Sequence, residues 1–280
     1  MDTATVVKPE VLSVQASGER PVCRFALDHP LIHFFVIAYA WTWIFWLAIP
    51  MIFHRVDTAA MIIGTFGPTV VALLTQWLGH RNLQIGPLWS NWRSMLIGLG
   101  IGLVAFFLVT VAFPAIFIAK SPRNIHWSFL FLLSTYGFTY QTLLGGPLGE
   151  EPGWRGFALP RLQTKVGAFG ASVILGALWA GWHLPLMRLP DWGGTRFWQF
   201  CVILMGVSML MTLSTNLARF GSIVPILLHA FFNTSSRMMN GVLTGVPRRE
   251  FDLHIYTAIV VVLGIVIGAA TLGRLKSKIS

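Results

Sequence analysis

The sequence predicts an all-α fold: a polytopic membrane helix bundle of about eight transmembrane helices, with a partly crossing helix near residues 150–166. The first observation is composition. Of 280 residues, 55% are hydrophobic and only 11% are charged, whereas soluble domains carry about 25% charged residues. The second observation is a series of long apolar runs separated mostly by short polar segments. Together they exclude a water-soluble globular protein.

Each apolar run is long enough to be a membrane span, because a hydrocarbon core about 30 Å thick needs roughly 20 apolar residues per helix. The runs lie at about residues 31–53, 59–79, 94–118, 127–148, 168–187, 197–217, 221–239 and 255–273. Helices are favoured because a helix satisfies all its backbone hydrogen bonds within one segment in lipid. Trp92, Trp127 and Trp198 near the ends of runs are typical of interfacial anchors.

The chain divides into an N-terminal tail, residues 1–30, and a single transmembrane domain, residues 31–280. The tail mixes charge, Pro and Ser, and lacks the apolar stretch of a cleaved signal peptide. Cys23 and Cys201 lie far apart in the sequence, so neither a disulfide framework nor a Cys-based metal site is expected.

The formal net charge of +10 comes from 20 basic and 10 acidic side chains. The basic residues are scattered between the apolar runs, which is typical of residues that face lipid head groups. A nucleic-acid partner requires a contiguous basic face instead. We therefore expect membrane lipids as a partner, and no nucleic acid.

Residues 145–167, GGPLGEEPGWRGFALPRLQTKVG, interrupt the apolar pattern with two acids, three basic residues, three Pro and six Gly. They read either as a polar loop or as a short helix. Pro152 suits the first turn of a helix, where its missing N–H has no partner anyway, and two carboxylates there complement the helix dipole. We predict a helix that begins at Glu150 or Glu151.

The two acids of this segment are expected to have different roles. Glu151 and Arg155 are four residues apart, so they share a helix face and form the better-oriented kind of ion pair. Glu150 is rotated about 100° from Glu151 and is left available for chemistry. The alternative is that both acids pair with basic loop residues at the surface.

Three further polar residues lie in or beside apolar runs: His183, His229 and Asn233. His183 ends a run, where an interfacial or hydrogen-bonded role is more common than a catalytic one. His229 and Asn233 are four residues apart on one predicted helix face, and such residues commonly hold membrane helices together. As a set with Glu150, they supply a general base and hydrogen-bond donors for an oxyanion.

Three motifs in this order resemble the CAAX prenyl endopeptidase and bacteriocin-processing family (CPBP, or Abi) of intramembrane glutamate proteases. They are Glu150-Glu151-Pro-Gly-Trp-Arg155, Trp179-Ala-Gly-Trp-His183 and His229-Ala-Phe-Phe-Asn233. The resemblance covers about residues 127–239. The chain departs from the family at Trp179, because the second motif of the family usually begins with Phe.

The resemblance implies a hydrolase that cleaves peptide bonds in a peptide or a lipidated protein. Glu150 and His183 would be catalytic by activating water, and His229 and Asn233 would be catalytic as donors to the oxyanion. Glu151, Arg155 and Trp179 would give structural support. The family also implies a multi-pass protein of the cell (plasma) membrane of a prokaryote, with no cofactor.

A zinc site is the alternative, because two His and one Glu are plausible zinc ligands. The chain has no HExxH motif, and Asn233 is an amide where zinc prefers His or a carboxylate, so we expect no metal.

A shared site also constrains topology. Glu150 follows the end of run 127–148 and His183 lies near the end of run 168–187, so if they share one site, residues 150–166 must return across the membrane at least in part. Seventeen helical residues reach about 25 Å.

Two other functions are open to the same residues. Buried acids and His residues also relay protons in transporters, although the chain shows no internal repeat of the kind that transporters often have. A non-proteolytic immunity or scaffold protein of the same family is the other alternative. The sequence itself does not identify the substrate.

Overall fold

A computed structural model of the chain describes residues 25–26, 28–53, 57–78, 85–108, 127–188 and 196–243. Within these residues the chain forms helices and no strand, which confirms the all-α fold. Parts of seven of the eight predicted spans fall in the described residues. The run 255–273 lies outside them, as does most of the tail 1–30, so the count of eight stays a prediction.

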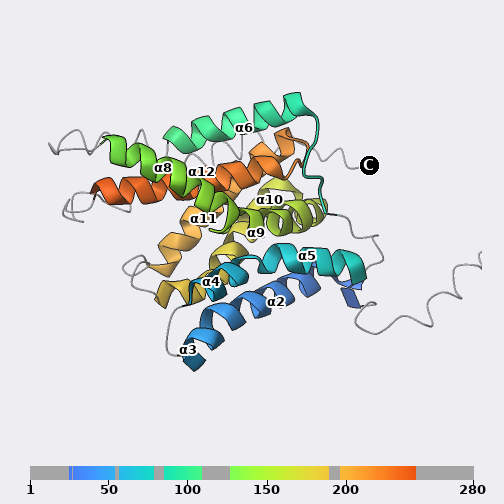
Figure 1. Ribbon diagram of the computed structural model, residues 1–280. Coiled ribbons are helices and arrows are strands. Elements are labelled where there is room, and N and C mark those ends of the chain that lie inside the picture. The colour runs from blue at the N-terminus through green and yellow to red at the C-terminus, as the bar shows by residue number, and fades with distance from the viewer. Residues whose placement is uncertain are drawn as a thin grey trace, which may run out of the picture.

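The helices form three groups in space (Figure 1). Helices α2, α4 and α5 lie on one side, α6, α8 and α12 on the other, and α9, α10 and α11 between them. Their bounds are α2 Pro30–Trp43, α3 Ile49–Phe53, α4 Thr58–Thr65, α5 Gly67–Leu78, α6 Trp92–Phe107, α8 Trp127–Leu143, α9 Pro147–Glu151, α10 Leu159–Trp182, α11 Phe197–Leu217 and α12 Ile223–Leu243.

Several helix ends follow directly from the sequence. The Asp57 side chain accepts a hydrogen bond from the Ala60 N–H and caps α4, and Asn91 caps α6 in the same way. Such side chains satisfy N–H groups that have no partner within the helix. Helices α4 and α5 meet at a bend of 44°, so the predicted run 59–79 is a bent pair.

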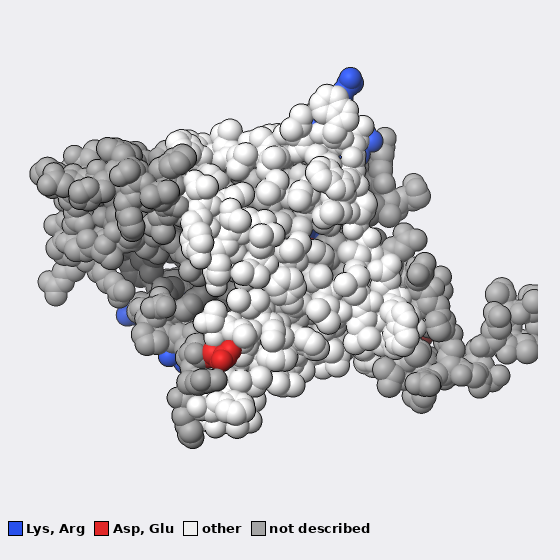
Figure 2. Space-filling model, viewed as in Figure 1, with Lys and Arg blue, Asp and Glu red and all other residues white. Residues whose placement is uncertain are grey.

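Three helical stretches are long and apolar enough to cross a membrane: Pro30–Phe53, Thr135–Trp182 and Phe197–Leu217. The bent pair α4–α5 is a fourth if it counts as one span. In the view of Figure 2 the described residues present a mostly uncharged surface, with basic groups mainly near its edges and an acidic group at the lower left. The protein is therefore an integral membrane protein.

The segment that contains the acidic pair is helical, but its start differs from the prediction. Helix α9 begins at Pro147, which occupies its first position, and Gly146 precedes it with a φ of 124°. The predicted start at Glu150 or Glu151 was wrong because two prolines compete for the first turn, and the left-handed turn at Gly146 places Pro147 there.

Pro152 therefore lies inside the helical segment, where it begins a π-helical turn, Pro152–Ala158, called η5. Proline has no N–H, so the carbonyl of Leu148 loses its usual partner four residues later. The Thr69 hydroxyl of α5 donates to that carbonyl at 3.2 Å. The helix continues into α10, which kinks at Gly167 with a φ of 72°.

Small residues allow this segment to approach α5 closely. A Cβ on Gly149 would lie 2.7 Å from the Thr65 carbonyl oxygen, and a Cβ on Gly153 would overlap the backbone of Pro68. Glycines four residues apart are a common means of close helix packing in membranes. The acidic pair is thereby fixed in the interior, against the bend between α4 and α5.

Candidate active site

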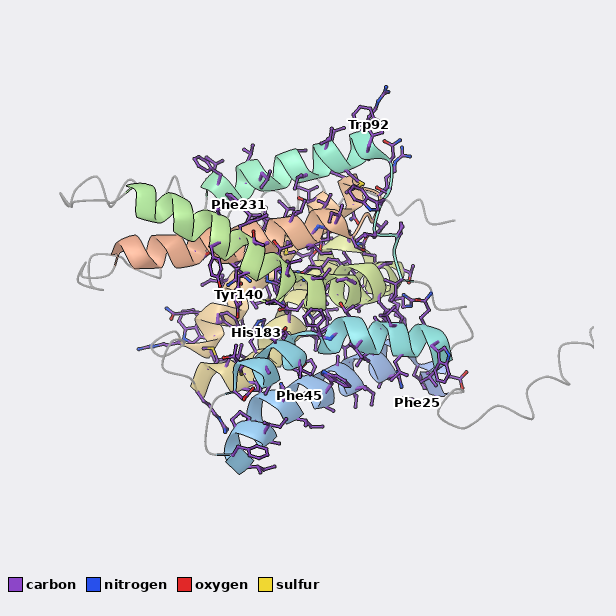
Figure 3. All side chains as sticks on the ribbon, in the orientation of Figure 1. Phe25, Phe45, Trp92, Tyr140, His183 and Phe231 are labelled. Carbon is purple, nitrogen blue, oxygen red and sulfur yellow. The ribbon has the colours of Figure 1, made fainter. Side chains whose placement is uncertain are left out.

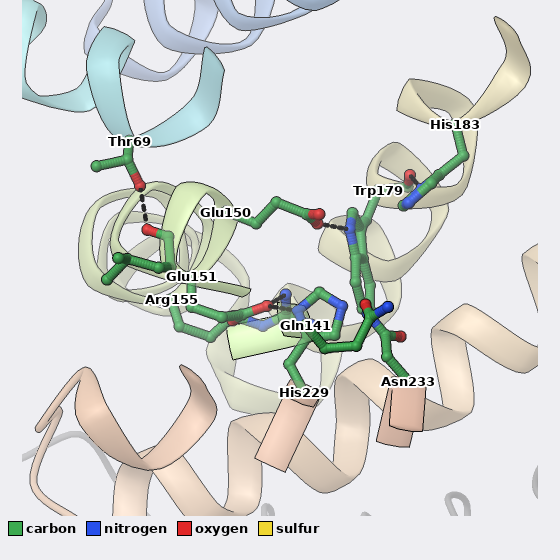
Figure 4. A network of polar contacts seen from close by, with 10 residues as sticks. Thr69, Gln141, Glu150, Glu151, Arg155, Trp179, His183, His229 and Asn233 are labelled. Carbon is green, nitrogen blue, oxygen red and sulfur yellow. Dashed lines mark hydrogen bonds and ion pairs between the residues drawn. The ribbon is translucent and has the colours of Figure 1, made fainter. Parts of the chain in front are cut away.

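A cluster of charged and polar side chains lies in the interior where α9, η5, α10 and α12 meet (Figure 4). It contains Glu150, Glu151, Arg155, Trp179 and His229, each at most 3% exposed. Ionisable groups at this depth are expensive and usually functional. The alternative of a surface pairing for the two acids is contradicted by their burial.

The predicted contact between Glu151 and Arg155 is present, with 3.0 Å from Nη1 of Arg155 to Oε1 of Glu151. The same oxygen also lies 2.8 Å from Nδ1 of His229, a contact that the sequence did not indicate. A carboxylate only accepts hydrogen bonds, so Nδ1 of His229 carries a proton. Glu151 therefore joins α9 to α12 as well as to η5.

Glu150 has a different partner. Its Oε2 accepts a hydrogen bond from the indole Nε1 of Trp179 at 2.7 Å, while a Cβ on Gly146 would overlap its Oε1. The carboxyl group thus lies between an N–H donor and a position that only glycine fits. Trp179, the aromatic residue that departs from the motif named in the sequence, is therefore the residue that holds Glu150.

His183 follows the last turn of α10, and its Nδ1 lies 2.8 Å from the carbonyl oxygen of Trp179. A carbonyl only accepts, so Nδ1 carries the proton, and in the neutral ring Nε2 has the lone pair. The ring is 8% exposed and lies edge-on to Trp182, with ring centroids 4.7 Å apart. Figure 3 shows His183 between the α4 and α8 sides of the bundle.

The end of α10 that carries Trp179 and His183 is held from α2. The Tyr39 hydroxyl donates to the Leu178 carbonyl, and Nε1 of Trp43 donates to the Trp182 carbonyl at 3.0 Å. The Trp182 carbonyl lies at the end of α10, where helix carbonyls lack internal partners, and the Leu178 carbonyl lies one turn earlier. Tyr39 and Trp43 are four residues apart in an apolar run, and this spacing alone did not predict that they hold the end of α10.

Asn233 is partly buried on α12, one turn from His229. Its Nδ2 donates to Oε1 of Gln141 on α8 at 3.3 Å. Gln141 is 2% exposed and was not among the site residues predicted from the sequence. The available signal was an amide in the middle of the apolar run 127–148, where an unpaired polar group would be costly.

One group of side chains offers ligand atoms for a metal: Glu150, Glu151 and His229, whose atoms lie within 4.8 Å of one another. The donor set does not fit a cation well. Oε1 of Glu151 already accepts from Nη1 of Arg155 and contacts Nδ1 of His229, so this oxygen would have to give up both contacts to bind a cation. The buried guanidinium adds a positive charge beside the group.

The comparison with protein families gives a match over residues 126–235 to the Rce1-like family, described as type II CAAX prenyl endopeptidase Rce1-like. This part of the chain is similar to the Rce1-like family, which supports the resemblance that the three motifs indicated.

The region also resembles an individual protein, CAAX prenyl protease 2 of Methanococcus maripaludis. The two are 28% identical over 122 residues, covering 37% of this chain and 44% of the relative. The chain thus matches less than half the length of this relative.

Proposed function

We propose that the protein is a membrane endopeptidase that uses water activated by Glu150 to hydrolyse a peptide bond. The observation that carries the proposal is the buried carboxyl of Glu150, held by Trp179, beside a second acid that is already paired with Arg155. One acid is neutralised by its neighbour, and the other is left to act as a general base.

In the proposed reaction Glu150, helped by His183, removes a proton from water as the water oxygen attacks the peptide carbonyl carbon. The carbonyl π electrons move to oxygen and form a tetrahedral oxyanion. When the intermediate collapses, the C–N bond breaks and the proton passes to the leaving amine. The contact of His183 Nδ1 with the Trp179 carbonyl orients the imidazole ring at the same turn of α10 that holds Glu150, which supports this role.

His229 and Asn233 are the proposed donors to the oxyanion. Glu151 accepts from Nδ1 of His229 at 2.8 Å and thus orients the ring, whose Nε2 would donate to the oxyanion when it carries a proton. Gln141 accepts one N–H of the Asn233 amide and leaves the other for the oxyanion. Donors held in place before the reaction stabilise charge at little reorganisation cost.

The substrate class that we propose is a membrane-associated or lipidated peptide, because the site lies inside a membrane protein and the matched family is described as prenyl endopeptidases. We further propose that the enzyme works in the plasma membrane of a prokaryote and without a metal. The pairing of Glu151 with both Arg155 and His229 supports a metal-free site.

The test is cleavage of a farnesylated CAAX peptide by the full chain purified in detergent. We expect cleavage that survives chelators and is lost in Glu150→Ala. Gln163→Ala, a change at a buried residue on α10 away from the site, serves as the matched control and keeps the activity.

Two results would contradict the proposal. Activity that chelators abolish and zinc restores would replace the metal-free mechanism. Full activity in Glu150→Ala would remove the proposed base, and the absence of cleavage would favour the proton-relay or non-proteolytic alternatives.

A further inference from the structure

Trp179 is the side chain that contacts most of the candidate site. Its Nε1 donates to Glu150, its ring lies 4.5 Å beneath the guanidinium carbon of Arg155, and His229 meets it edge-on at a centroid distance of 5.0 Å. It is 1% exposed. The indole is therefore fixed on several sides, and its N–H points at one acid only.

Glu150 has a strong competing partner nearby. Nε and Nη2 of Arg155 are buried and have no hydrogen-bond partner among the described residues. Buried unpaired donors are costly, and hydrogen bonds to charged groups are stronger than neutral ones. A carboxylate that was not held elsewhere would be drawn towards this guanidinium, where Glu151 already lies.

We propose that Trp179 is a positioning residue whose indole N–H holds Glu150 away from Arg155, in the orientation in which it acts on water. This inference rests on the proposed function. Trp179 contacts Glu150 through its indole N–H and the Arg155 guanidinium through its ring face, so one side chain fixes the position of the proposed base relative to the guanidinium. A phenyl ring at position 179 would keep the apolar packing but lacks the N–H.

The kinetic test compares Trp179→Phe with Trp154→Phe in the purified full chain. Trp154 is also fully buried, but its Nε1 has no hydrogen-bond partner among the described residues. Both changes therefore remove similar ring volume, and only Trp179→Phe removes a hydrogen bond. For Trp179→Phe we expect a fall in kcat of about 10- to 100-fold with KM little changed. Trp154→Phe keeps kcat.

Equal losses in the two variants, or a loss in Trp179→Phe that is confined to KM, would overturn the inference, because a packing role predicts either result. The thermal midpoints of both variants are measured in the same preparations, and we expect similar decreases.

A spectroscopic test detects the hydrogen bond between Trp179 and Glu150 without measuring activity. In protein with 15N-labelled tryptophan, Trp179→Phe identifies one of 12 indole N–H signals. We expect this signal to move upfield in Glu150→Ala, as the bond to the carboxylate is lost, and the Trp154 signal to stay. An unmoved Trp179 signal would overturn the inference. Failure of the wild-type chain to cleave any peptide would instead refute the proposed function, and the signal would still decide whether Trp179 holds Glu150.

Discussion

Two polar contacts in the interior involve the same helical segment but differ in how completely they are paired. Gln163 and Asn216 join α10 to α11 through two reciprocal amide hydrogen bonds of 3.0 and 3.3 Å. In the cluster around Glu151 and Arg155, by contrast, Oε2 of the acid and two nitrogens of the guanidinium have no partner among the described residues.

The difference distinguishes a contact that holds two helices together from a contact in the candidate active site. A reciprocal amide pair satisfies both groups and holds two helices together, which is the usual role of such residues in membranes. Unpaired buried charge costs free energy, so it persists where the polar atoms serve another purpose. The completeness of hydrogen bonding thus distinguishes the partly buried amide pair from the fully buried pair of Glu151 and Arg155.

The largest expected effect on stability is at Arg155. Arg155→Ala leaves the Glu151 carboxylate buried with a weaker partner, and breaking a buried pair in this way costs about 3 to 5 kcal/mol. The measurement is the free energy of unfolding in detergent micelles. Arg93→Ala, at a cation–π contact over the exposed Trp92, is the control and is expected to change little. Equal effects at the two positions would contradict the importance of the buried pair.

The next effect is on rate. Asn233→Ala removes one proposed oxyanion donor, so we expect kcat to fall about 100- to 1000-fold with a small change in stability. Asn216→Ala removes an amide of the same type from the reciprocal pair and should leave kcat unchanged. If both variants keep kcat, Asn233 is a structural amide as well.

The smallest effect is at the amide pair itself. A double-mutant cycle of Gln163→Leu and Asn216→Leu should give a coupling free energy of about 0.6 to 1.7 kcal/mol, the range for polar pairs in membrane helices. Unfolding of the two single variants and the double variant supplies the measurement. A coupling energy near zero would mean that completeness of pairing does not identify a stabilising contact.

The helices and the contact between Glu151 and Arg155 could be predicted because both depend on local spacing. Run 197–217 coincides with α11, Phe197–Leu217, and an i, i+4 pair requires only a helix. The helix start at Pro147 was missed because the sequence offers two prolines, and the positive φ of Gly146 decides between them.

Long-range contacts explain the remaining misses. Gln141 lies 92 residues from Asn233 along the chain, and Glu151 lies 78 residues from His229. Spacing within one helix carries no information about such partners. The substitution of Trp for Phe at position 179 was visible in the sequence, but its hydrogen bond to Glu150 depends on how α10 packs against α9.

The most direct test of the account is the Glu150→Gln variant, with peptide cleavage and thermal unfolding measured on the same preparation. Gln has the shape of Glu and still offers an oxygen to the Trp179 N–H, but it cannot take a proton from water. We predict that kcat falls about 100- to 10,000-fold, the contribution of general-base catalysis, while the unfolding midpoint is kept. Retained kcat at an unchanged midpoint would contradict the claim that Glu150 is the base.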